Sequence, residues 1–170
     1  GDEDRAAFYL ALVDVLEGLR AAHQKALSAL NADPSPMEAM GEGSGALRRL
    51  RDALQRVPWE PARDFYEALV AVNFMYYIDG CDNLGRFDQD LGAYYDTDLD
   101  RGQIAEEDGT RLVKQMWANI DANSGWNVAI GGSRSDGSSA SNRLTLACLR
   151  AAHRQRRPNL ALRVAPNTPE

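Results

Sequence analysis

The stretch of residues 65–102 constrains the fold more than any other part of this 170-residue chain. Its first part, residues 65–77, is apolar on two opposite faces of a helix, so this helix is expected to be buried. A turn is expected at residues 79–84, and an amphipathic helix rich in Asp and Tyr follows it. The acidic side chains of this second helix predict a solvated face, formed by Asp88, Asp90, Asp96, Asp98 and Asp100.

The rest of the chain predicts further helices and two short strands. Apolar residues at helical spacing indicate helices near residues 4–30, 47–57, 112–120 and 144–151, the last with Ser138 or Ser139 as its N-cap. Pro61 is expected in the first turn of the buried helix. Short apolar runs at 126–130 and 160–164 predict strands, and strand, helix, strand in this order favours a parallel βαβ unit. The expected fold class is therefore mostly α with a βαβ unit.

These elements predict one partial domain over residues 1–170, in three parts. Residues 1–57 would hold N-terminal helices with a mobile loop at 31–45, where two prolines and three glycines occur. Residues 58–122 would form a helical core, and residues 123–165 the βαβ unit.

Charge and cysteine content exclude several classes of protein. A net charge of −6 and a pI near 5.0 argue against nucleic-acid binding. No apolar run approaches the ~20 residues of a membrane helix. Cys81 and Cys148 form no pair motif, so no zinc site is expected and a cytoplasmic location is the simplest. A calcium loop needs glycine at its sixth position, but in a loop starting at Asp96 the glycine is seventh, so no metal site is predicted.

Several short motifs occur in an order that resembles the pyruvate formate-lyase-type domain of the glycyl radical enzymes. The first is the run Gly85, Arg86, Phe87, Asp88, Gln89 after the turn. The resemblance covers about residues 58–165 and implies that the chain is a fragment of a ten-stranded α/β barrel. The later motifs are Tyr94-Tyr95, Gly102-Gln103-Ile104, Ile130-Gly131-Gly132, Asp136-Gly137, Asn142-Arg143-Leu144 and Pro158-Asn159-Leu160.

The resemblance implies part of an anaerobic enzyme that performs radical chemistry on a small-molecule substrate, as a lyase, dehydratase or acyltransferase. This chain would contribute a wall of the substrate pocket. No residue here matches the family's catalytic cysteine or radical glycine, so no catalytic residue and no cofactor is expected within the chain, which alone would be inactive. The glycyl radical and a radical activating enzyme would belong to the full-length protein. Uncovered strand edges would favour self-association.

The resemblance also implies roles for individual residues. Gly80 and Cys81, in the turn, would lie in the substrate pocket; diol dehydratases of the family carry polar residues there, and this chain does not. Trp126 is either a third pocket residue or a packing anchor. Gly85, Arg86, Asp88 and Gln89 would form a structural motif.

An alternative function belongs to a different class. The chain could be a stand-alone, non-catalytic helical module, derived from such a barrel, that binds a partner or small molecule. The length of the natural open reading frame discriminates between the two. Position in the turn also predicts that Cys81 reacts faster with alkylating reagents than Cys148, which lies on the apolar side of a helix.

Overall fold

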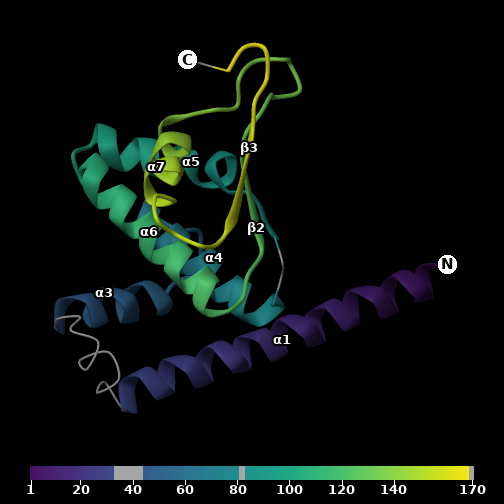
Figure 1. Ribbon diagram of the computed structural model, residues 1–170. Helices are drawn as coiled ribbons and strands as arrows, with labels where there is room; N and C mark the ends of the chain where they lie inside the picture. The colour runs from purple at the N-terminus through teal and green to yellow at the C-terminus, as the bar shows by residue number, and fades with distance from the viewer. Residues whose placement is uncertain (33–43, 81–82, 169–170) are drawn as a thin grey trace. The chain divides into compact units, whose positions relative to one another are not determined.

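The computed structural model describes residues 1–32, 44–80 and 83–168 (Figure 1). The chain divides into two compact units, Gly1–Arg56 and Val57–Glu170. Most of the loop expected at residues 31–45 falls on positions 33–43, outside the described residues. At its two ends the expectation was wrong, because residues 31–32 and 44–45 are helical.

The first unit consists of α1 (Asp2–Ala32) and α3 (Ser44–Leu54). The helix expected near residues 4–30 is confirmed, and it is longer by two residues at each end. Its first turn is acidic, which suits the positive end of the helix dipole. The two helices are joined where the Arg51 guanidinium donates to the backbone carbonyl of Leu30 at 2.6 Å.

Four helices of the second unit surround its core: α4 (Phe65–Asp79), α5 (Phe87–Asp100), α6 (Glu106–Ala122) and α7 (Arg143–Ala151). The start of α4 was expected at Pro61, but the N-cap is Asp64, whose side chain accepts from the Glu67 N–H at 2.7 Å. The N-cap of α7 is Asn142, not Ser138 or Ser139.

The second unit also contains a three-stranded sheet of β1 (Asn83–Arg86), β2 (Asn127–Gly131) and β3 (Asn159–Arg163), in the order β1-β2-β3. All the pairs are parallel, so the expected parallel β2-α7-β3 unit is confirmed. Strand β1 was missed, since residues 79–84 were expected to form a turn and Gly85 to begin a helix. Four residues that include Asn83 and Gly85 have low strand propensity, and pairing with the distant β2 stabilises them.

The core of this unit lies between the helices and one face of the sheet. Figure 1 shows α4 to α7 gathered on one side of β2 and β3. Val128 and Ile130 of β2 have no exposed surface and belong to the same apolar cluster as Phe65, Phe87 and Trp117. The ring centroids of Phe87 and Trp117 lie 5.0 Å apart.

The acidic face expected for α5 is only partly present. Asp96 is half-buried and Asp100 is exposed, and both pair with Arg143 at 2.8 Å. Asp88 and Asp98, however, are buried, which corrects the expectation of a solvated face. A buried carboxylate needs hydrogen-bond donors, and Asp98 Oδ2 accepts from the backbone N–H of Phe65 at 2.9 Å.

Within the described part of the chain, no helix has the length and apolar character needed to cross a membrane.

Candidate functional site

A buried carboxylate, Asp88, joins three elements at the carboxyl end of β2. Asp88 is the second residue of α5 and has no exposed surface. Its Oδ2 accepts from the backbone N–H of Gly131 at 2.8 Å and from the hydroxyl of Thr145, in the first turn of α7. Hydrogen bonds to a charged group are about twice as strong as neutral ones. Asp88 therefore fixes the start of α5 and the start of α7 relative to the end of the central strand.

The N-cap of α7 reinforces the same junction. The Asn142 Oδ1 accepts from the Thr145 N–H at 3.1 Å, and its Nδ2 donates to the backbone carbonyl of Asp88 at 2.8 Å. A Cβ on Gly92 would lie 2.7 Å from that Nδ2. Because hydrogen bonds hold both the Oδ1 and the Nδ2 of Asn142, its side chain cannot move aside for a Cβ. The residue of α5 at this point, Gly92, therefore has to be glycine.

Both backbone groups of Gly131 are held by side chains of α5. Asp88 accepts from its N–H, and the Gln89 amide donates to its carbonyl at 2.9 Å. Gly131 has a φ of 69°, and a Cβ there would lie 2.9 Å from the carbonyl oxygen of Arg163. The residue must therefore be glycine for two reasons, conformation and space. The run Gly85–Gln89 thus contacts the Gly131-Gly132 pair directly.

Two buried polar atoms at this junction have no hydrogen-bond partner among the described residues. They are Asp88 Oδ1 and Ser141 Oγ. Ser141 Oγ lies 3.3 Å from the position that a Cβ of Gly131 would occupy, so both atoms belong to the surroundings of this glycine. An unpaired buried polar atom costs about 1–3 kcal/mol.

The second face of the sheet, which we term the open face, carries small and polar residues. Val128 and Ile130 point to the helices, so the alternate residues of β2 point the other way. Paired residues of neighbouring parallel strands lie on the same face. The open face therefore holds an Asn row, an Ala pair and the strand ends: Asn83, Asn127, Asn159, Ala129, Ala161, Arg86, Gly131 and Arg163.

An irregularity in β1 turns Arg86 toward the open face. Asn83 pairs with Asn127 and Arg86 pairs with Ala129, so three steps along β1 match two along β2. The extra residue is accommodated at Gly85, which has a φ of 71° and whose N–H is bonded to Asn83 Oδ1 at 2.8 Å. A bulge of this kind redirects a side chain. In a regular strand, Arg86 would face the helices.

The expected pocket residues lie at the opposite end of the sheet. Gly80 is the left-handed C-cap of α4, ahead of β1, and Cys81 lies outside the described residues. Trp126 directly precedes β2, is 56% exposed, and has the Arg157 guanidinium 5.2 Å from its ring centroid. Gly80 and Trp126 are thus both at the amino ends of strands. Gly85, Arg86, Asp88 and Gln89 lie at the carboxyl ends.

Two titratable side chains of the core, Cys148 and Tyr95, are held in their neutral forms. Burial raises the pKa of the Cys148 thiol well above its ordinary value, and the nearby Asp88 charge adds to this. Burial and then the Glu106 carboxylate raise the pKa of the Tyr95 phenol. Cys148 is therefore a packing residue and a poor nucleophile.

Across residues 1–32, 44–80 and 83–168, no three His, Cys, Asp or Glu side chains gather as a metal site.

Three residues that contribute to this site were not predicted as site residues from the sequence. Asn142 and Thr145 cap α7 locally, but their contacts with Asp88 join residues far apart along the chain, 57 residues in the case of Thr145. The pattern Asn-x-x-Thr before an apolar helix is a capping signal and could have identified the first two. No local signal marks Arg163.

Two relatives of known activity are similar to this chain over most of its length. The isethionate sulfite-lyase of Desulfovibrio desulfuricans is 29% identical, over 73% of this chain and 18% of the relative. The 4-hydroxyphenylacetate decarboxylase glycyl radical subunit of Clostridioides difficile is also 29% identical, over 94% of this chain and 20% of the relative. The chain thus spans about a fifth of the length of these relatives.

Solved structures of the same kind have a similar fold. A glycyl radical enzyme from Archaeoglobus fulgidus matches 73% of this chain and 19% of its own, with a TM-score of 0.67 and 24% identity. The B12-independent glycerol dehydratase from Clostridium butyricum matches 87% of this chain and 21% of its own, with a TM-score of 0.66 and 23% identity.

A family model, described as pyruvate formate lyase-like, matches residues 1–170. The resemblance noted from the motifs of the second unit is therefore confirmed over the entire sequence. The chain belongs to the pyruvate formate lyase-like family and represents part of a glycyl radical enzyme domain.

Proposed function

We propose that this chain forms a wall of the substrate pocket in a glycyl radical enzyme that acts on a small metabolite. One observation carries the proposal: a parallel sheet with helices on one face and small, polar side chains on the other. Parallel sheets are normally covered on both faces and are rich in Val, Ile and Leu on both. Asn, Ala and Gly on the open face suit a polar cavity better than a second apolar layer.

Membership in the family supports radical chemistry as the reaction class. In the proposed enzyme, the radical glycine and the reactive cysteine lie outside this chain, and a separate activating enzyme generates the radical. The role of the chain is then to position the substrate and to exclude solvent from the pocket. The junction of Asp88, Gln89 and Gly131 holds the strand end in place, and a rigid wall keeps reacting groups in register.

Gly80, Cys81 and Trp126 remain proposed pocket residues at the amino ends of the strands. Gly80 lacks a side chain and Trp126 is largely exposed in this chain, which supports a contact with a ligand or with another part of the enzyme. An anaerobic setting follows from the same proposal, because a glycyl radical has to be kept from oxygen, and a cytoplasmic location is proposed with it.

Electron paramagnetic resonance tests this proposal. The natural protein that contains this segment is purified without oxygen and incubated with a radical activating enzyme and a reductant. We expect a glycine-centred doublet in that protein and none in the 170-residue chain treated in the same way. A natural protein that ends near Glu170 and gives no doublet would overturn the proposal and favour the stand-alone binding module.

A further inference from the structure

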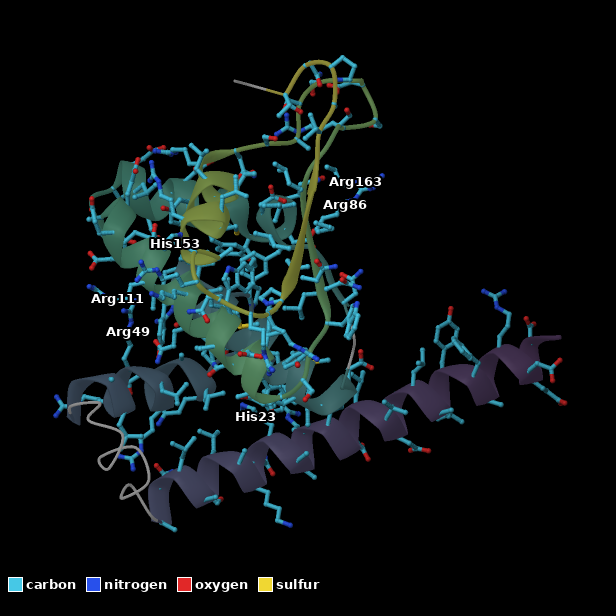
Figure 2. All side chains as sticks on the ribbon, in the orientation of Figure 1. His23, Arg49, Arg86, Arg111, His153 and Arg163 are labelled. Atoms are coloured by element: carbon cyan, nitrogen blue, oxygen red, sulfur yellow. The ribbon has the colours of Figure 1, made fainter. Side chains whose placement is uncertain are left out.

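The first half of α1 exposes a group of large apolar side chains. Residues 2–18 are exposed on every side of the helix, and Figure 2 shows side chains projecting from both sides of its ribbon. Seven of these side chains are large and apolar: Phe8, Tyr9, Leu10, Leu12, Val13, Val15 and Leu16. Contiguous apolar patches on soluble proteins commonly mark interaction surfaces. This half of α1 is therefore a candidate interface.

One row of these residues has the spacing of a coiled-coil seam. The row continues through α1 in alternating steps of four and three residues, and we call it the α1 seam: Phe8, Leu12, Val15, Leu19, Ala22, Ala26 and Ala29. Apart from the half-buried Leu19, the seam is exposed along its whole length. The row beside it in the second half of α1 is buried or half-buried instead, at His23, Leu27 and Leu30. The packing of α1 thus covers a neighbouring row and leaves the seam uncovered.

The charges of α1 are divided between its two halves. Residues 2–17 hold five acidic side chains and one basic side chain, Arg5. Residues 18–32 hold two basic side chains, Arg20 and Lys25, and no acidic one. In a parallel pair of identical helices, the two acidic halves would lie side by side and repel each other. In an antiparallel pair, the acidic half of each copy lies beside the basic half of the other, and the helix dipoles are also opposed.

We propose that two copies of this chain associate through the α1 seam as an antiparallel pair of helices. The register that places Leu12 opposite Val15 of the second copy also places Phe8 opposite Leu19 of the second copy, because residues on antiparallel helices pair at a constant sum of their numbers. Two-fold symmetry repeats each contact. All four large residues of the seam are then covered. The inference stands on α1 alone and goes beyond the proposed pocket wall.

The flanks of the seam fit the same register. Antiparallel coiled coils bring together the flanking positions of the same kind, so Asp4 lies across from Lys25 of the second copy on one flank, and Tyr9 lies across from Leu16 on the other. Within a single copy, Asp4 pairs with the Gly1 ammonium at 2.8 Å, but its side chain is 91% exposed. Exposed ion pairs contribute little affinity. The Asp4 and Lys25 pairs therefore select the orientation, and the apolar seam supplies the affinity.

Sedimentation velocity on the 170-residue chain tests the association. We expect a reversible equilibrium between monomer and dimer that shifts with protein concentration, and no species larger than the dimer, because a two-fold interface is closed. A chain that stays monomeric at the highest concentration, or that forms open-ended oligomers, would overturn the proposal.

Matched variants locate the interface on α1. Leu12→Asp places a charge in the middle of the seam and should weaken the dimer at least about tenfold. Leu10→Asp is the control, because Leu10 is 66% exposed on the opposite side of the same helix, and it should leave the dimer unchanged. Equal losses in the two variants would contradict the seam. Circular dichroism melting curves check that each variant is folded.

A charge exchange tests the antiparallel orientation. Asp4→Lys and Lys25→Asp should each weaken the dimer about three- to tenfold, because each places like charges across the flank. The double variant with both changes restores opposite charges and should recover the original affinity. A double variant that is no stronger than the single ones would contradict the antiparallel register.

The natural protein that contains this segment distinguishes a second copy from another part of the same protein as the occupant of the seam. Its mass in solution is measured with and without Leu12→Asp. A dimer that this change converts into a folded monomer supports the proposal. A natural protein that keeps its oligomeric state, or that unfolds, has its seam covered by its own chain and would overturn the proposal. The electron paramagnetic resonance signal is recorded separately, so failure of this interface and failure of the proposed enzyme function are distinguishable.

Discussion

Replacing Asp88 by alanine should destabilise the second unit more than replacing any exposed acidic residue. The substitution removes two hydrogen bonds to a buried carboxylate, from the Gly131 N–H and the Thr145 hydroxyl. Hydrogen bonds to charged groups contribute about 1.5–3 kcal/mol each, or about 3–6 kcal/mol for the pair. Loss of the unpaired Oδ1 returns about 1–3 kcal/mol. The expected net loss is about 2–4 kcal/mol, against about 5–15 kcal/mol for a typical domain.

Urea unfolding followed by tryptophan fluorescence measures this loss in the right part of the molecule. All three tryptophans, Trp59, Trp117 and Trp126, belong to the second unit. Asp90→Ala is the matched control, because Asp90 is an exposed acidic residue in the same first turn of α5. It should change stability by less than about 0.5 kcal/mol. Asp88→Asn retains one acceptor and should lie between the two. If Asp88→Ala were as stable as Asp90→Ala, the junction described here would be wrong.

Three further predictions concern single residues. Gly131→Ala should cost at least about 2 kcal/mol of unfolding free energy, from its positive φ and the close carbonyl of Arg163; an unchanged urea midpoint would refute this. The buried Cys148 thiol, whose pKa is raised, should react with a thiol reagent only as fast as the protein unfolds, and Cys81 faster; mass mapping of early labelling on Cys148 would contradict this. Hydrogen bonds from Ser138 lower the pKa of Asp136. These bonds therefore stabilise the folded state above the ordinary aspartate pKa, and the stabilisation is lost as the pH falls through the lowered value. Ser138→Ala should raise the pKa of Asp136 in a carbon-detected titration.

Apolar periodicity was sufficient to predict most helices and two of the strands. The helical spacing in α1 and the apolar runs of β2 and β3 are local signals, and the structure differs from them by only one or two residues at the ends. The start of α4 was less accurate, because Asp64 competes with Pro61 as a start signal and its carboxylate caps the helix.

The candidate site was harder to predict because its contacts are distant in sequence. An aspartate in the first turn of a helix is typically exposed, and nothing local indicates that Asp88 meets a backbone N–H 43 residues away. Likewise β1 exists because β2 pairs with it, and the direction of Arg86 depends on one extra residue in that pairing. Motif order pointed to the Gly85–Gln89 run as important, but not to its contact with Gly131.

The most direct test of the account is a structure of the natural protein that contains this segment, determined with its substrate or product bound. We predict that the open face lines an internal polar cavity, with Asn127, Ala129 and Ala161 on its wall. An open face that is covered by apolar side chains, or that lies on the outer surface away from the ligand, would contradict the account.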